Sequence, residues 1–148
     1  MRAYLCTVLL ATLLVVPGLS LAAGPSVSAS GVWVRAAPAG VEFMAGFLTL
    51  TNHTDQLLTL TRITSPDFGS VNVVQTPESR QAGPPPASTP LRLPAGQSVT
   101  LAPGGQQLRI TKPVHRLYEG DLVTLLLSFS DGSSLTIMAP VRRRPPGH

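Results

Sequence analysis

Cysteine is almost absent from this chain of 148 residues. The single cysteine, Cys6, lies in the apolar segment at the N-terminus, and no lipobox precedes it, so it is not a lipid attachment site. The rest of the sequence therefore has no thiolate metal ligand, no disulfide and no cysteine nucleophile.

Aromatic residues and lysines are also scarce. Aromatic side chains make up 5% of the sequence, and Lys112 is the only lysine among eleven basic residues. A nucleic-acid surface normally combines a basic stripe with aromatic platforms, so we expect no nucleic-acid partner. The arginines are scattered except at 142–144, which begin a basic, proline-containing tail at 142–148. We expect this tail to be solvated, with weak contact to anionic lipid heads as the alternative.

Long apolar runs are missing everywhere except near the N-terminus. Residues 5–16 are apolar, follow a short basic start and are too few to cross a bilayer. Small residues at the −3 and −1 positions then favour cleavage near Ala22 by a signal peptidase. We expect a signal peptide at 1–22, a periplasmic product and no stable membrane insertion after its removal; an uncleaved anchor is the alternative.

Turn-forming residues are abundant instead, with fifteen prolines and thirteen glycines between short runs of Val, Leu, Thr and Ile. This punctuation predicts an all-β fold, an antiparallel β-sandwich. We expect a flexible segment at 23–31, one domain at 32–141, and a two-residue hairpin turn at Asp131-Gly132. The expected strands lie at 32–35, 45–52, 57–63, 71–74, 91–93, 98–101, 107–111, 122–129 and 134–141.

Six short segments carry a more specific signal when they are read in order. They are Trp33-Val34-Arg35 with Pro38-Ala39-Gly40, the strand at 45–52, Ser65-Pro66, Leu93-Pro94-Ala95-Gly96, Leu101-Ala102-Pro103-Gly104-Gly105, and Glu119-Gly120-Asp121. Together they resemble the periplasmic copper chaperones of the PCu(A)C type. The resemblance implies a cupredoxin-like (immunoglobulin-like) sandwich, periplasmic handling of Cu(I) or its delivery to an oxidase, and a partner in cytochrome oxidase assembly.

The resemblance also implies a Cu(I) site made of two His-x-Met pairs, which this sequence does not contain. After the Ser-Pro turn, Val74 stands at the family's His position and Thr76 at its Met position. After the Pro-Gly-Gly turn, Gln107 stands at the His position and Arg109 at the Met position. The family has a further methionine between the two His-x-Met pairs, and its position corresponds to the region near Pro85 in this sequence. Valine has no lone pair, threonine and glutamine offer hard oxygens, and arginine is always cationic. We therefore expect no metal at these positions, and Cu(I) is implied by resemblance only.

Other soft or imidazole donors remain in the sequence. They are Met44, Met138, His53, His115 and His148. Methionines in a sheet usually pack against neighbours, and isolated histidines are usually surface residues. His115 lies close in sequence to the segment that carries Gln107, and we expect it to be the best candidate for a relocated ligand.

No motif indicates an enzyme, because the sequence has no nucleophile elbow, paired-carboxylate signature or phosphate-binding glycine loop. Two classes of function remain open. The first is a copper chaperone with relocated or partner-supplied ligands. The second is a metal-free binding module that contacts an envelope protein through Val74 and Arg109. The alternative to a partner contact at Val74 is that its side chain turns inward and fills the cleft that holds the metal in the copper chaperones.

Overall fold

Nine strands and no helix make up the described part of the chain. The computed structural model describes residues 24–37, 41–75 and 88–147. The strands are β1 (Val27–Arg35), β2 (Phe43–Asn52), β3 (Leu58–Thr64), β4 (Phe68–Gln75), β5 (Leu91–Leu93), β6 (Ser98–Leu101), β7 (Gln106–Pro113), β8 (Leu122–Phe129) and β9 (Ser134–Arg142). Each expected strand region is present, and the all-β class is confirmed.

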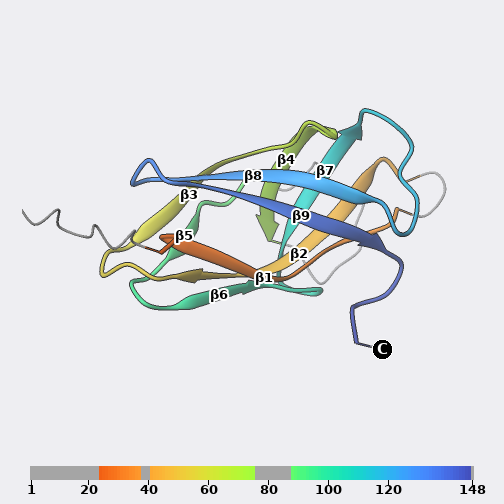
Figure 1. Ribbon diagram of the computed structural model, residues 1–148. Coiled ribbons are helices and arrows are strands. Elements are labelled where there is room, and N and C mark those ends of the chain that lie inside the picture. The colour runs from red at the N-terminus through yellow and green to blue at the C-terminus, as the bar shows by residue number, and fades with distance from the viewer. Residues whose placement is uncertain (1–23, 38–40, 76–87, 148) are drawn as a thin grey trace, which may run out of the picture.

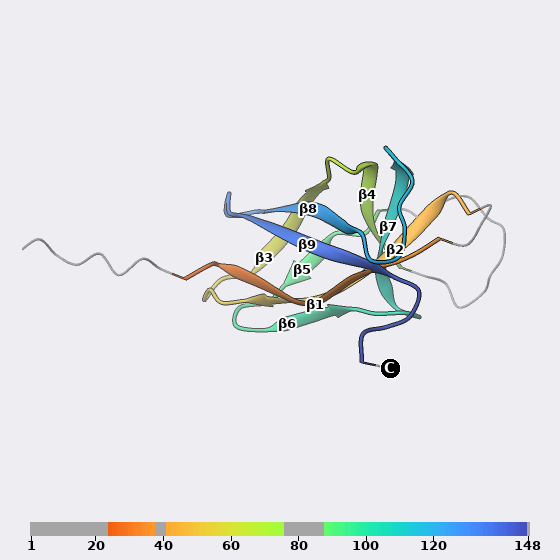
Figure 2. The same cartoon turned by 45° about the vertical axis from the view of Figure 1, so that its right-hand side comes forward.

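The strands form two layers that are joined along one side (Figures 1 and 2). One layer has the order β4-β7-β2-β1, with β6 also paired to β2, and the other has the order β9-β8-β3-β5. Most pairs are antiparallel, but β1 and β9 run parallel, with Val34 opposite Val141 and Arg35 opposite Arg142. This parallel pair makes the two layers one nearly closed β-sandwich.

The core lies between the layers and follows from the alternation of side chains along each strand. In β8, Val123, Leu125 and Leu127 are fully buried, and they belong to one apolar cluster with side chains of the opposite layer. Burial of such side chains contributes about 1.5–3 kcal/mol each and is the main force that holds the layers together.

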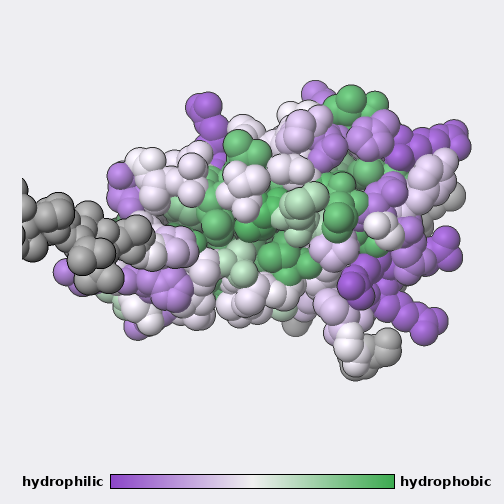
Figure 3. Space-filling model, viewed as in Figure 1, coloured by the Kyte–Doolittle hydropathy of each residue, from purple (hydrophilic) through white to green (hydrophobic). Residues whose placement is uncertain are grey.

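The outward residues of β8 and β9 form an apolar stripe on the surface. Leu122, Leu126 and Met138 are exposed there, and apolar side chains gather along the middle of this face (Figure 3). We expected Met138 to pack in the sheet, but its side chain is 58% exposed, so that expectation is wrong. Met138 lies opposite Thr124, whose neighbours Val123 and Leu125 face the core instead.

One buried polar side chain connects the layers at the end of β2. Asn52 is fully buried, and its amide nitrogen donates hydrogen bonds to the carbonyl oxygens of Gln56 (2.7 Å) and Leu93 (2.9 Å). Its side-chain oxygen accepts hydrogen bonds from the backbone nitrogen and the hydroxyl of Thr54, at 2.9 and 2.8 Å. Asn52 thus holds the turn after β2 in shape and ties it to β5.

Two local features differ from the sequence-based expectations. β1 begins at Val27 rather than at residue 32, so residues 27–31 of the segment that we expected to be flexible belong to a strand. A bulge between Ser30 and Trp33 lets both halves of this strand pair with β2. Gly31 lies in this bulge with φ +59°, a conformation that suits glycine.

The β8–β9 hairpin has three loop residues rather than two, since the Phe129 nitrogen donates a hydrogen bond to the Ser133 carbonyl oxygen at 2.9 Å. Gly132 takes the left-handed position that such loops require.

The described residues contain no helix that is long and apolar enough to cross a membrane. The signal peptide at 1–22, the cleavage near Ala22, Thr76, Pro85 and His148 lie outside the described residues. These predictions remain predictions.

Candidate functional site

The positions of the two family histidines lie directly opposite each other in the structure. Val74 on β4 pairs with Gln107 on β7, and Asn72 pairs with Arg109 in the same antiparallel ladder. Directly opposite residues point to the same face of a sheet, with Cβ atoms about 4.5–5.5 Å apart. Strands β4 and β7 therefore bring together two positions that are far apart in the sequence, at a separation that one metal ion can bridge.

The side chains at these positions do not fit Cu(I). Val74 has no lone pair, and the amide of Gln107 is a hard donor that Cu(I) disfavours. The guanidinium carbon of Arg109 lies 4.4 Å from the centroid of the Phe43 ring, so a permanent cation is fixed beside the valine and the glutamine. This donor set is unsuitable for a copper site.

The burial of Val74 decides between the two expectations for this residue. Val74 is 2% exposed although it lies outside the main core cluster. A side chain so deeply buried has almost no surface to offer a partner, so the expectation that Val74 makes a partner contact is not supported. Its burial agrees with the alternative in which the valine fills the cleft. Arg109 is half-buried, so part of its side chain remains accessible to a partner.

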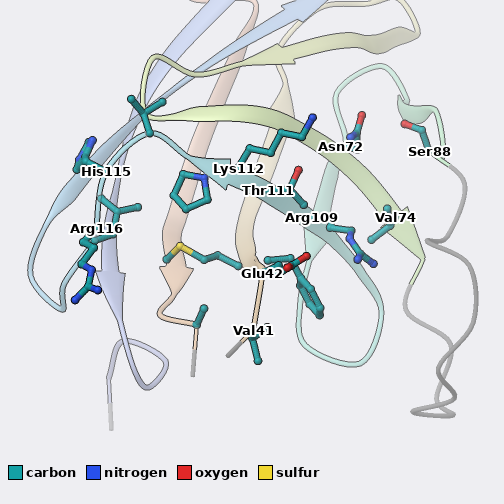
Figure 4. A pocket seen from close by; sticks show the side chains of 16 residues that line it. Val41, Glu42, Asn72, Val74, Ser88, Arg109, Thr111, Lys112, His115 and Arg116 are labelled. Carbon is teal, nitrogen blue, oxygen red and sulfur yellow. The ribbon is translucent and has the colours of Figure 1, made fainter. Parts of the chain in front are cut away.

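A large groove runs along the same face of the molecule (Figure 4). Its volume is about 1420 Å³, and it extends from Val74 and Arg109 at one end to His115 and Arg116 at the other. Strands β2, β4 and β7 and the segment after β7 line it. We call it the basic groove, after its four basic residues Arg109, Lys112, His115 and Arg116.

His115 lies in the basic groove but far from the family ligand positions. An extended strand rises about 3.3 Å per residue, so the path along β7 from Gln107 to Pro113 covers roughly 20 Å. His115 follows that path and lies at the other end of the groove (Figure 4). It therefore cannot complete a copper site at Gln107, and the closeness in sequence that favoured it is misleading.

The other soft or imidazole donors lie in different surroundings. Met44 lines the groove and is buried, and His53 bonds through Nε2 to the Ser28 hydroxyl at 2.7 Å. Within residues 24–37, 41–75 and 88–147, no three His, Cys, Asp or Glu side chains lie close enough together to hold a metal ion.

Lys112 has an unusual backbone conformation at the centre of the groove. It is the only non-glycine residue in the described ranges with a positive φ, at 56°. It packs against Gly69 of β4, where an added Cβ atom would lie 2.9 Å from the Lys112 Cβ. The glycine therefore leaves room for the lysine, whose side chain extends along β4 toward Asn72 (Figure 4). A left-handed conformation costs an L-residue about 1–2 kcal/mol, so this strain must be offset elsewhere.

We predict that Lys112→Gly leaves the free energy of unfolding unchanged or raises it by up to about 1 kcal/mol. The substitution removes the strain of the positive φ, while glycine adds about 0.5–1 kcal/mol of backbone entropy cost. Urea denaturation measures the effect, and Lys112→Ala is the matched control, because it removes the same side chain but keeps the strained Cβ. A glycine variant less stable than the alanine variant would contradict the prediction.

The groove is barely visible in the sequence. Lys112 and Arg116 belong there to a scattered set of charges, and nothing marks Phe43 as a support for Arg109. The register of β4, β7 and β2 brings these residues onto one face, and no short-range pattern encodes that register. The single lysine of the chain was the only available signal.

The structure resembles solved PCuAC domains. The apo PCuAC domain from PmoF1 superposes with a TM-score of 0.68 at 22% identity, over 80% of this chain and 95% of that one. The copper-bound PCuAC domain from PmoF2 gives 0.65 at 24% identity, over 80% and 94%. The Cu(I) form of DR1885 from Deinococcus radiodurans gives 0.62 at 27% identity, over 84% and 81%. The expected cupredoxin-like, immunoglobulin-like sandwich is confirmed.

Sequence comparison identifies relatives of the same kind. A curated protein of Leifsonia xyli subsp. xyli, named "Putative lipoprotein Lxx21020", is 30% identical over 117 residues, which cover 78% of this chain and 69% of the relative. The matched family and the structures named above are described as lipoproteins and PCuAC domains rather than enzymes, in agreement with a non-enzymatic chain. The family model described as "Putative lipoprotein LpqE-like" matches residues 27–141. The chain therefore belongs to the LpqE-like family.

Proposed function

We propose that this protein is an exported member of the copper-chaperone fold whose Cu(I) binding is weak or absent at the family's ligand positions. The observation that carries the proposal is the Val74–Gln107 pair. The scaffold holds the two positions at a bridging distance, but the side chains there supply no soft donor. The function is thus one of binding in the cell envelope, with delivery of copper to an oxidase as the role that the fold resemblance implies.

Export to the periplasm is part of this proposal. The apolar segment at 5–16 with small residues before Ala22 supports it, and the matched family and the Leifsonia relative are both described as lipoproteins. This chain has no lipobox at Cys6, so we propose release by cleavage near Ala22 rather than attachment through a lipid.

A second candidate function is a metal-free binding module that contacts an envelope protein. The basic groove favours it, because the groove contains the exposed apolar side chains Val41, Phe43 and Val114 beside several cations. Exposed apolar surface with a charged border is typical of protein contact sites. Under this function, Arg109 belongs to the contact surface and Val74 supports it from below.

We predict that the protein lacking residues 1–22 binds Cu(I) more weakly than about micromolar, which corresponds to roughly −8 kcal/mol. The missing donors at Val74, Gln107 and Arg109 are the reason. Competition against a chromogenic Cu(I) chelator in reducing buffer measures the affinity.

Two variants make that titration decisive. His115→Ala and Met44→Leu each remove one soft or imidazole donor of the basic groove. If the parent binds one equivalent of Cu(I) tightly, the proposal is wrong. Loss of that binding in either variant would then identify a relocated site.

A further inference from the structure

The size of the basic groove points to an extended ligand. Pockets for small molecules usually enclose about 300–1,000 Å³, and this groove is larger, at about 1420 Å³. It follows strand β7 and continues along the segment after it, from Arg109 to Arg116. An extended peptide has the length and narrow width that such a groove accommodates.

The apolar lining of the groove is exposed to solvent. Val41 and Phe43 are each 38% exposed and Val114 is 69% exposed, so three large apolar side chains face the same space. Apolar side chains grouped in this way commonly mark interaction sites. The occupant should therefore carry apolar side chains of its own.

Within the described residues, the basic side chains of the groove outnumber the acidic ones. Arg109, Lys112 and Arg116 are three cationic side chains, His115 adds a fourth basic group, and Glu42 is the only acidic residue among the described residues of the lining. Among the described residues the single salt bridge is Arg143–Glu119, which lies outside the groove. The three cations therefore have no carboxylate within ion-pairing distance in the described ranges.

Two of these cations are held in place without an anionic partner among residues 24–37, 41–75 and 88–147. The Phe43 ring supports the Arg109 guanidinium at 4.4 Å, and Lys112 keeps a strained backbone with Gly69 leaving room for it. Strained residues that persist in a structure often serve binding. Cations fixed before binding also lose less entropy when a ligand arrives.

We propose that the basic groove binds an acidic peptide segment of a partner protein, in which glutamate or aspartate alternates with apolar side chains. The carboxylates pair with Arg109, Lys112 and Arg116, and the apolar side chains contact Phe43 and Val114. A nucleic acid fits poorly, because Phe43 is the only aromatic side chain of the lining and already stacks on Arg109. This inference rests on the second candidate function, the binding module, and gives its partner a chemical class.

The test is fluorescence anisotropy with a labelled peptide of about ten residues that alternates glutamate and leucine. A peptide of the same length that alternates lysine and leucine is the charge-reversed probe. We expect the acidic peptide to bind and the basic one not to bind. Because exposed charges are screened by salt, binding should weaken clearly between about 0.05 M and 0.5 M salt.

Charge reversal locates the binding site. Lys112→Glu combined with Arg116→Glu should weaken binding of the acidic peptide by about tenfold or more, since two favourable pairs become repulsive. Arg92→Glu on β5 is the control for each single groove reversal, Lys112→Glu or Arg116→Glu, because Arg92 is exposed and lies outside the groove. It should leave the affinity within about twofold of the parent. Lys112→Gly should weaken binding without loss of stability, which separates a binding role from a structural one.

Three outcomes would overturn the proposal. If the acidic peptide does not bind, the groove has no acidic partner. If it binds but Arg92→Glu weakens it as much as the groove variants do, the attraction comes from net charge, and the binding-module function survives without this groove. If the protein binds vesicles of anionic phospholipid but not the peptide, the groove faces a lipid surface. The Cu(I) competition is independent of all three results.

Discussion

Four substitutions that restore the family ligands should create a Cu(I) site on this scaffold. The variant carries Val74→His, Thr76→Met, Gln107→His and Arg109→Met. Because Val74 and Gln107 are directly paired across β4 and β7, the two imidazoles would converge on one point, and the residue at 109 lies on the same face. We expect Cu(I) to bind more tightly than about nanomolar, a gain of at least a thousandfold over the parent, or roughly 4 kcal/mol.

The variant should still fold, although at some cost. Val74 is almost fully buried, so a polar imidazole in its place is expected to lower the free energy of unfolding by about 1–3 kcal/mol. Arg109→Met also removes the contact with Phe43, which is worth about 0.5–1 kcal/mol at a partly exposed site. Cu(I) should recover this loss by binding only the folded state, which a rise in Tm on metal addition would show.

The matched control places leucine at all four positions, which changes the same residues without adding donors. Competition against the Cu(I) chelator should separate the two variants clearly. If the His/Met variant folds and still competes no better than the leucine variant, the strand pair does not hold the ligands in a copper-binding geometry. The proposal that only the donors were lost would then be wrong.

Asn52→Ala should destabilise the protein by about 3 kcal/mol or more. Asn52 is fully buried and makes four hydrogen bonds to groups of Thr54, Gln56 and Leu93. Alanine leaves several of these partners without a hydrogen bond, and each unsatisfied buried polar group costs about 1–3 kcal/mol. The removed side chain also leaves a cavity between the turn and β5.

Urea denaturation measures this loss, with Asn72→Ala as the control. Asn72 is exposed, and its side-chain nitrogen donates a hydrogen bond to the Ser70 hydroxyl, its single side-chain bond within the described ranges, so its replacement should cost less than about 0.5 kcal/mol. A loss below about 1 kcal/mol for Asn52→Ala would mean that water replaces the amide, and that the turn after β2 does not depend on this residue.

The strands were predictable from the sequence because apolar and polar residues alternate within each strand, and turn-forming residues separate the strands at regular intervals. Val, Leu and Thr at every second position mark the faces of β2 and β8, and Pro-Gly segments mark their ends. The start of β1 was missed because Ser28, Ser30 and Gly31 are not typical strand residues. They form a strand there because the backbone of β2 offers them hydrogen-bond partners. Tertiary pairing therefore overrides weak local propensity.

The candidate site was only partly predictable. The opposition of Val74 and Gln107 agrees with the spacing of the family motif, because the ladder between β4 and β7 places these two positions opposite each other. The separation of His115 from Gln107 follows from strand geometry, because eight residues along an extended chain cover more than 20 Å. Whether His115 is a ligand elsewhere in the groove stays a prediction, which the His115→Ala titration tests. The grouping of Arg109, Lys112 and Arg116 could not be predicted, since it depends on which face each strand turns outward and on the left-handed conformation of Lys112.

The parallel pair of β1 and β9 has a consequence for how the protein folds. It joins strands from opposite ends of the domain, so the first strand lacks one of its neighbours until the last strand has been made. Contacts of such long sequence separation slow folding, because the chain must close a large loop before they form. A nascent chain that lacks β9 therefore has an open edge at β1 and cannot join the two layers of the sandwich.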